Sequence, residues 1–339
     1  MADMTPPAPI PSGAAAFLSA HGWGEARILP LAADASFRRY FRVVDKGRVA
    51  VLMDAPPPHE DPRPFVAIAR WLGERGFAAP AIHAMDLDAG LVLLEDFGDA
   101  RMKEAIDADP EATLALYERA VDTLIDLRRH PVGPLAPYDR DVLAREAALF
   151  VEWYCPALGL TIDRAGWDAA WNRVFDHALA AQPVTVLRDF HAENLMLRPG
   201  MGGERAPLGL LDFQDALAGH PAYDLVSLLQ DARRDVDPGV EEAMLHRYRA
   251  ATGEGDAFLA AYHVLGAQRN AKILGIFTRL WRRDGKPRYP ALCPRVWAYL
   301  ERDLSQPVLA PVAAWFDDNV PVERRGDPLV LADGARAHA

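Results

Sequence analysis

A chain of 339 residues is long for a single hydrophobic core and therefore suggests two packed lobes. The formal net charge of −11 argues against a nucleic-acid partner, and the two cysteines, Cys155 and Cys293, give neither a disulfide framework nor the spacing of metal ligands. The sequence shows no signal peptide and no stretch near the roughly 18 apolar residues of a membrane span. We therefore expect a cytoplasmic protein without a nucleic-acid, membrane or obligate protein partner.

The first hundred residues alternate between patterns typical of strands and of helices. In chain order, the predicted elements are a helix at 13–23, strands at 26–32, 38–44 and 48–54, a helix at 65–76, and strands at 81–87 and 90–98. From about residue 100 the pattern changes to long helical segments. The simplest architecture is α+β, with a small mixed lobe over residues 1–97 and a larger, mainly helical lobe over residues 98–339.

Polar residues interrupt an apolar stretch at 186–197, VLRDFHAENLML. Asp189 and Asn194 lie on one predicted loop, and Asp212 ends another apolar strand, in PLGLLDFQDA. The Gly- and Pro-rich RPGMGGERAP between them is typical of a hairpin turn, which would bring Asn194 and Asp212 close together. An amide oxygen and a carboxylate suit Mg²⁺, a hard ion that binds oxygen, and Asp189 could accept a proton from a substrate hydroxyl.

Each of these residues alone has an ordinary explanation, because a loop Asp or Asn commonly caps a helix or forms a turn. The combination is more informative. An Asp/Asn pair, a hairpin and an Asp on the second strand favour a phosphoryl-transfer site, in which one Asp meets the attacking hydroxyl while an Asn and a second Asp hold magnesium.

The segments LRDFHAENLML and LLDFQDALAGHPAYDLVSLL resemble the core of the aminoglycoside phosphotransferase family, which is related to the protein kinases. The usual loop of that family reads H-G-D-x-H-x-x-N, and Leu187 and Arg188 replace its His and Gly. The resemblance implies a protein-kinase-like two-lobe fold with ATP and Mg²⁺ as cofactors. It implies that Asp189 is the catalytic base and that Asn194 and Asp212 are the magnesium ligands. It also implies that His191 and Asp224 brace the loop by hydrogen bonds. For Asp224, a charge at a helix start is an equally good explanation.

By the same resemblance, LVLLEDFG lies where a kinase hinge connects the two lobes, so backbone groups of Glu95, Asp96 and Phe97 would bind the adenine edge. The segment is equally compatible with a strand that simply leaves the sheet. The loop LAADASFRRY lacks the glycines that often cover phosphates, although its small residues, Ser36 among them, permit a similar approach.

The phosphate-binding lysine of kinases is missing from its usual place. Met53 stands there on the third strand, and Glu74 lies near the end of the following helix rather than in its middle. Loss of both members of the Lys–Glu pair is coherent, because a lone buried charge is costly. The candidates for a replacing cation are Arg38, Arg39 and Arg42. We include Arg42 in the predicted nucleotide site.

Further blocks, among them ADASFRRYFR, MDAPP and AQRNAKILGIFTRL, resemble one branch of the family, the anomeric sugar kinases of peptidoglycan recycling. That branch phosphorylates N-acetylmuramate and N-acetylglucosamine at the anomeric hydroxyl, so the resemblance implies a small amino sugar as substrate. The alternatives are a kinase for choline, homoserine or an aminoglycoside, and a pseudokinase that binds without transferring phosphoryl groups. The missing lysine motivates the pseudokinase, and the retained Asp189, Asn194 and Asp212 oppose it.

Two segments of the helical half offer the aromatic floor and the directional polar groups that a sugar site needs. FVEWYCPALG carries Glu152, Trp153 and Tyr154, and GAQRNAKILGIF carries Arg269, whose guanidinium could bind a lactyl carboxylate in a paired geometry. Alternatively, the aromatic residues belong to the core and Arg269 is a solvated residue on a helix face. The acceptor candidates are Glu152, Tyr154 and Arg269.

Overall fold

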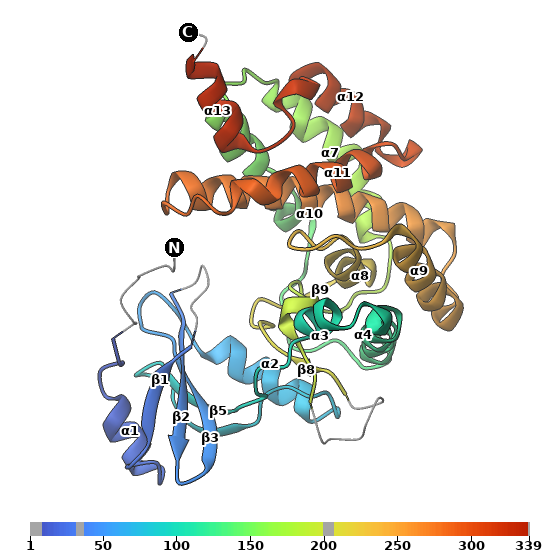
Figure 1. The fold of residues 1–339 in the computed structure, drawn as a ribbon. Helices are drawn as coiled ribbons and strands as arrows, with labels where there is room; N and C mark the ends of the chain where they lie inside the picture. Colours follow the sequence, from blue (N-terminus) through green and yellow to red (C-terminus); the bar gives the residue numbers. More distant parts are fainter. Residues whose placement is uncertain (1–8, 32–36, 199–206, 338–339) are drawn as a thin grey trace. The chain divides into compact units, whose positions relative to one another are not determined.

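The computed structural model describes residues 9–31, 37–198 and 207–337, and the chain divides into two compact units (Figure 1). The N-terminal unit comprises residues 1–109 and 193–215, and the helical unit comprises residues 110–192 and 216–339. The lobe boundary expected at residue 97 stays a prediction. Ser36, predicted to lie near the nucleotide phosphates, falls outside the described residues.

The N-terminal unit is built on a five-stranded antiparallel sheet with the strand order β1-β2-β3-β5-β4. Its strands are β1 (Arg27–Pro30), β2 (Arg39–Asp45), β3 (Arg48–Asp54), β4 (Ile82–Asp86) and β5 (Leu91–Glu95). Side chains alternate between the two faces of a strand, so Phe41 and Val43 of β2 share one core with α1 (Ala14–Ala20). All five predicted strands are present, with ends that differ from the prediction by a few residues.

One predicted helix follows the Pro-rich segment, and a shorter one comes after the sheet. α2 (Arg63–Gly73) buries its apolar face, which includes Phe65, Ile68 and Leu72. It ends before the predicted residue 76 because Gly76 adopts a left-handed φ of 83°, which closes the turn after the helix. α3 (Met102–Ala108) lies in the same unit.

Residues 193–215 return to the N-terminal unit as a short hairpin of β7 (Leu195–Met196) and β8 (Gly209–Leu210). The N–H of Leu210 donates to the carbonyl oxygen of Ala78 at 2.8 Å. Beyond β8, the ring of Phe213 stacks on Phe65 of α2, with ring centroids 5.0 Å apart. The pairing of β7 with β8 confirms the predicted hairpin.

The helical unit is organised around α10 (Asp256–Arg282), which contacts α5 (Arg140–Ala147), α7 (Arg164–Leu179), α8 (Ala222–Leu229) and α11 (Cys293–Leu304). Figure 1 shows α10 and α11 lying against each other. The other principal helices are α4 (Thr113–Leu127), α9 (Pro238–Thr252), α12 (Ala310–Asn319) and α13 (Pro328–Ala337). A two-stranded sheet of β6 (Val184–Val186) and β9 (Leu217–Gly219) completes the unit. Among the described helices, none combines the length and the apolar character that a membrane crossing requires.

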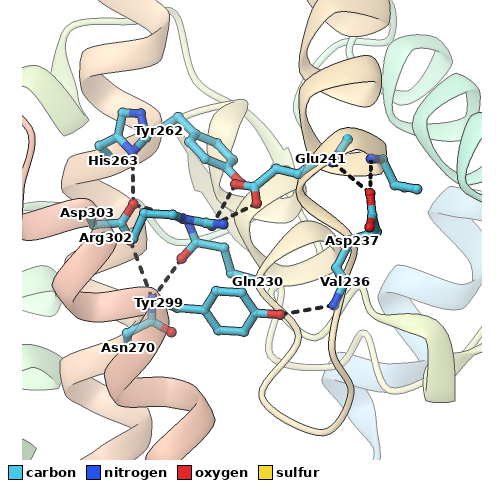
Figure 2. Close-up of polar contacts among 12 residues, drawn as sticks. Gln230, Val236, Asp237, Glu241, Tyr262, His263, Asn270, Tyr299, Arg302 and Asp303 are labelled. Carbon is cyan, nitrogen blue, oxygen red and sulfur yellow. Dashed lines mark hydrogen bonds and ion pairs between the residues drawn. The ribbon is translucent and has the colours of Figure 1, made fainter.

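A buried polar cluster joins α10 to α11 and to the residue that caps α8 (Figure 2). Asp303 lies 2.8 Å from His263 Nδ1 and accepts a hydrogen bond from Gln230 Nε2 at 3.2 Å, while Asn270 donates to Gln230 Oε1 at 2.7 Å. α10 carries a glycine where it faces Asp303 of α11. A Cβ on Gly266 would lie 2.3 Å from Asp303 Oδ2, so a larger residue would not fit there without a shift of Asp303. We call Gln230, His263, Asn270 and Asp303 the α10–α11 cluster.

Candidate active site

The two predicted magnesium ligands both lie at the open end of the β7–β8 hairpin in the N-terminal unit. The N–H of Leu211 donates to the carbonyl oxygen of Asn194 at 3.0 Å, and the side-chain nitrogen of Asn194 lies 3.5 Å from Asp212 Oδ2. Asp212 has a left-handed φ of 58°, an uncommon conformation for a residue with a side chain. Gln214 donates to Asp212 Oδ1 at 2.9 Å. The structure therefore brings Asn194 and Asp212 together, as the hairpin predicted.

The chemistry of these two side chains fits Mg²⁺. Both can offer oxygen, and the carboxylate of Asp212 is exposed. Among the described residues, no group of three or more His, Cys, Asp or Glu side chains could hold a metal ion. A pair of oxygen donors suits magnesium bound with a nucleotide, because that ion usually takes its remaining ligands from phosphates and water. The metal-binding role stays a prediction.

The predicted hinge segment also lies in the N-terminal unit. Glu95 accepts a hydrogen bond from Arg198 at 2.7 Å, and the Arg198 guanidinium lies 4.8 Å from the centroid of the Phe97 ring. Gly209 of β8 packs on that ring so closely that a Cβ there would lie 2.7 Å from Phe97 Cδ2. Contacts with the hairpin therefore hold the segment that was predicted to bind adenine.

Two of the three candidate arginines form ion pairs within the sheet region. Arg39 pairs with Asp54 at 2.5 Å. Arg42 donates to Asp96 at 2.6 Å and to Asp99 at 2.8 Å, and these hydrogen bonds, that to Asp99 first, raise the pKa of Arg42. Both arginines thus connect the strands to neighbouring carboxylates. The third candidate, Arg38, has different surroundings and is considered below.

The usual Lys–Glu pair of kinases is absent at its expected position. Met53 is completely buried on β3, opposite Tyr40 of β2. Glu74 lies at the C-terminal cap of α2, where it pairs with its neighbour Arg75 at 3.6 Å. These positions agree with the departure predicted from the sequence.

The predicted catalytic base belongs to the helical unit. Asp189 lies in the turn after β6, and its side chain is 43% exposed. Its Oδ1 atom lies 4.0 Å from Arg269 Nη2. Burial acts to raise the pKa of Asp189, but nearby positive charges, first that of Lys272 and then that of Arg269, outweigh it and lower the pKa below its usual value. The carboxylate is therefore ionised at neutral pH.

Asp224 braces the backbone of this turn. It lies in the first turn of α8, is 3% exposed, and accepts hydrogen bonds from the N–H groups of Leu187 at 2.7 Å and of Arg188 at 2.8 Å. Burial raises the pKa of Asp224 to about 7 against the opposing effect of these two hydrogen bonds, and the charge of Asp189 adds to the rise. These contacts support the predicted bracing role.

Arg188 explains why the family loop carries glycine at this position. Its φ is 72°, in the left-handed region that glycine occupies freely and that costs other residues about 1–3 kcal/mol. The side chain of Arg188 pairs with Glu146 of α5 and lies 5.7 Å from the centroid of the Tyr138 ring. The ion pair is one interaction that holds this strained residue in place.

Glu146 is a residue that the sequence reasoning missed. It is 9% exposed, pairs with both Arg188 and Lys272, the latter at 3.1 Å, and accepts a hydrogen bond from the hydroxyl of Tyr138. Burial alone would raise the pKa of Glu146, but the charges of Lys272 and Arg188 lower it. The signal in the sequence was indirect: an arginine at the glycine position needs an anionic partner if its guanidinium is buried. We call Glu146, Arg188, Asp189, Arg269 and Lys272 the catalytic-loop cluster.

His191, the other predicted brace, is 3% exposed, and its Nε2 atom lies 3.2 Å from Arg233 Nη1. Burial lowers its pKa, which favours a neutral ring. This placement is consistent with a supporting role for His191 in the loop.

Comparison with known proteins gives this arrangement a family. A family model described as "Phosphotransferase enzyme family" matches residues 27–262. The chain belongs to this phosphotransferase family. An N-acetylmuramate/N-acetylglucosamine kinase of Caulobacter vibrioides is 41% identical over 92% of this chain and 97% of its own length. A Pseudomonas aeruginosa protein of the same name is 42% identical over 83% of this chain and 86% of its own.

Solved structures share the fold of this phosphotransferase at low sequence identity. A choline/ethanolamine kinase family protein from Mesorhizobium loti matches with a TM-score of 0.61 and 16% identity, over 89% of this chain and 97% of its own. The ternary complex of APH(2″)-IIa with streptomycin and ATP matches with a TM-score of 0.56 and 12% identity, over 82% of this chain and 95% of its own. The kinase-like fold, an N-terminal antiparallel sheet followed by a largely helical region, confirms the predicted fold class.

The acceptor candidates of this phosphotransferase have three different environments. Arg269 is 5% exposed and donates to Ser227 Oγ at 2.8 Å, so the alternative of a solvated helix-face arginine is wrong. Glu152 is exposed and pairs with Arg164 at 3.8 Å. Tyr154 is completely buried, and its hydroxyl accepts a hydrogen bond from Trp297 Nε1 at 2.9 Å.

Glu152 and Tyr154 share a single π-helical turn, η2 (Phe150–Tyr154), in which the ring of Tyr154 stacks on Phe150 at 5.0 Å. This packing favours the alternative that Tyr154 is a core residue. Of the three acceptor candidates, Arg269 is the one that the structure places beside Asp189. The acceptor roles themselves stay predictions.

Proposed function

We propose that this phosphotransferase transfers the γ-phosphoryl group of ATP to the anomeric hydroxyl of N-acetylmuramate and N-acetylglucosamine. The similarity over most of its length to relatives that carry these sugars in their names supports the choice of substrate. The products would be sugar 1-phosphates for peptidoglycan recycling, and the need for ATP points to the cytoplasm as the place of reaction.

The observation that carries the proposal is the position of Asp189. Its side chain is 43% exposed in the turn after β6, and Arg269 lies 4.0 Å from its Oδ1 atom, so the carboxylate is accessible beside a buried cation. Nearby positive charges lower the pKa of Asp189, which makes the carboxylate a weak base. The anomeric hydroxyl of a reducing sugar is more acidic than the other hydroxyls of the ring, so it gives up its proton to a weak base more easily than they do.

The remaining residues of the site divide the work. Asp189 accepts the proton of the anomeric hydroxyl while the anomeric oxygen of the sugar attacks the γ-phosphorus. The bond from that phosphorus to the leaving ADP oxygen breaks. Asn194 and Asp212 hold the magnesium ion, which when bound neutralises charge on the phosphates. The backbone of Glu95, Asp96 and Phe97 binds adenine. Arg269 lies 4.0 Å from the carboxylate of Asp189 and would contact an acceptor bound beside it.

The test is a product analysis on the purified chain. We expect ADP release with N-acetylmuramate and with N-acetylglucosamine, and a phosphorus NMR signal coupled to the anomeric proton of each product. Treatment with a chelator should stop the reaction, and added Mg²⁺ should restore it. A 6-phosphate, or turnover of choline, homoserine or an aminoglycoside only, would contradict the proposed acceptor. Nucleotide binding without turnover of any acceptor would favour a pseudokinase.

A further inference from the structure

The N-terminal unit contains a cavity of about 350 Å³ that the preceding assignments do not use. It is lined by the residue before β2, the Pro-rich segment before α2, the first turn of α2 and the two residues after Phe213. The polar lining residues are Arg38, His59, Glu60, Asp61, Gln214 and Asp215. Among these residues, Arg38 carries a positive charge at every physiological pH.

Arg38 is held inside the unit by a carboxylate. Its side chain is 10% exposed, and its Nε atom lies 3.4 Å from Glu60 Oε2, whose own side chain is 20% exposed. Glu60 comes from the segment that leads into α2. Arg38 comes directly before β2 and Glu60 shortly before α2, so the pair combines a cation and an acid as the kinase Lys–Glu pair does, but from segments outside the sheet and the helix.

The cavity lined by Arg38 and Glu60 also reaches the predicted magnesium ligand. Gln214 and Asp215, two of its lining residues, follow closely after Asp212 in the chain. Gln214, which lines the cavity with Arg38, also donates to Asp212 at 2.9 Å.

Of the three candidate arginines, Arg38 is the one that lines this cavity. Arg39 pairs with Asp54 on the neighbouring strand, and Arg42 pairs with Asp96 and Asp99. An arginine can hold a carboxylate and a phosphate together, because its donors form a rigid fork. The cavity lining contains three carboxylates, those of Glu60, Asp61 and Asp215, so a phosphate would enter it with a divalent cation rather than alone.

We propose that Arg38, positioned by Glu60, is the phosphate-binding cation of this protein and replaces the lysine that kinases carry on the third strand. The inference rests on the proposed function in one respect, namely that ATP is the phosphoryl donor. Arg38 contacts the phosphates, and Glu60 is a positioning residue that acts through Arg38.

The experiment measures binding separately from turnover. Calorimetric titration compares Mg·ATP with adenosine on the full chain and on Arg38→Gln. We expect the affinity for Mg·ATP to fall roughly 10- to 100-fold, the effect of losing one charge-assisted hydrogen bond, while the affinity for adenosine stays unchanged. The value of kcat/KM for ATP should fall by the same factor, and the KM for the sugar should not change.

Three further variants serve as controls and comparisons. Arg48→Gln removes an arginine from the same sheet that is 55% exposed and paired with Asp45, and it should bind Mg·ATP normally. Arg39→Gln should likewise keep its affinity. Glu60→Gln should lose part of the Mg·ATP affinity, and combining it with Arg38→Gln should add little, because Glu60 acts through Arg38.

Several outcomes would overturn the inference. Unchanged Mg·ATP affinity in Arg38→Gln would do so, and so would an equal loss of adenosine and Mg·ATP affinity, which marks a purely structural residue. A larger loss in Arg39→Gln would transfer the role to Arg39. If Arg38→Gln does not fold, Arg38→Met decides the question, because methionine keeps an unbranched side chain but removes the charge: unchanged Mg·ATP affinity of Arg38→Met would contradict the proposal.

The failure of this inference is distinguishable from the failure of the proposed function. If the unaltered chain phosphorylates neither sugar but binds Mg·ATP through Arg38, the proposed acceptor is wrong and the role of Arg38 stands. If the unaltered chain and Arg38→Gln phosphorylate the sugars equally well, the role of Arg38 is wrong and the proposed function stands.

Discussion

Two polar clusters of the helical unit place an aspartate in opposite environments. Asp303 of the α10–α11 cluster is completely buried among the amides of Gln230 and Asn270 and the ring of His263, and burial raises its pKa to about 6. In the catalytic-loop cluster, Asp189 remains 43% exposed, and neighbouring cations lower its pKa. A buried polar cluster therefore does not by itself indicate a reactive site. Asp189 differs from Asp303 in its accessibility and in the cations around it.

α10 supplies both clusters from adjacent positions. Arg269 reaches toward Asp189, while Asn270 belongs to the α10–α11 cluster. Neighbouring residues of a helix point about 100° apart, so one buried helix can serve two clusters on different sides. Changes on α10 should therefore separate the clusters cleanly.

The largest expected effect distinguishes the two carboxylates by activity. Asp189→Asn should lower kcat by roughly 10²- to 10⁴-fold, because the neutral amide cannot accept the proton of the substrate. Asp303→Asn should retain turnover within a few-fold of the unaltered chain. The check is steady-state ADP release, with circular dichroism to show that both variants fold. Near-normal turnover of Asp189→Asn would remove it from the role of base.

The next effect concerns stability rather than chemistry. Glu146→Gln should lower the free energy of unfolding by roughly 3 kcal/mol, because Arg188 and Lys272 lose the charge that they share in the interior. The matched control is Glu118→Gln, since Glu118 pairs with Arg247 at the surface and its loss should cost about 1 kcal/mol or less. Urea denaturation measures both. Equal effects of the two changes would mean that Glu146 is not the anchor of the cluster.

A smaller effect should appear in how stability depends on pH. The pKa of Asp303 is raised from 3.8 to about 6, so the folded protein binds the proton more tightly than the unfolded chain. The stability that this group contributes is present at low pH and is lost as the pH rises through the window from about 4 to about 6. In Asp303→Asn, the decrease in the free energy of unfolding across this pH window should be smaller by roughly 1–3 kcal/mol. Parallel pH profiles of unfolding for the two proteins would show that Asp303 does not titrate in this window.

The smallest expected effect is a shift in a pH–rate profile. Arg269→Gln removes a positive charge 4.0 Å from Asp189, so the pKa of Asp189 should rise and the acidic limb of kcat/KM should move to higher pH. Arg302→Gln is the control, because Arg302 of α11 pairs with Glu241 at 2.7 Å beside the α10–α11 cluster (Figure 2). An acidic limb that stays in place in Arg269→Gln would show that another group, such as Asp224, controls it.

Local pattern was sufficient to predict much of this molecule. The alternation of apolar residues gave the strands of the N-terminal sheet, and the turn composition between Arg198 and Pro207 gave the hairpin that brings Asn194 to Asp212. These features depend on residues that are near one another in the sequence. The fold class followed from the same patterns together with the family resemblance.

The partners of the catalytic loop could not be predicted in this way. Glu146 precedes Arg188 by 42 residues, and Lys272 follows much later on α10. Which distant charges meet is decided by tertiary packing, and a sequence pattern gives the periodicity of a helix but not its neighbour. The same limit applied to Arg269, whose helical position was clear while its burial beside Asp189 was not.

The left-handed backbone at Arg188 has a consequence for how such a loop can change over generations. A glycine at position 188 would relax the backbone but leave Glu146 with one cation fewer. A neutral residue at position 146 would remove the carboxylate that pairs with the guanidinium of Arg188, while the backbone of Arg188 stayed strained. Each single step is therefore unfavourable in the background of the other. Arg188 and Glu146 form an epistatic pair, and a lineage that leaves this arrangement must exchange both residues nearly at once or pass through a weakened intermediate.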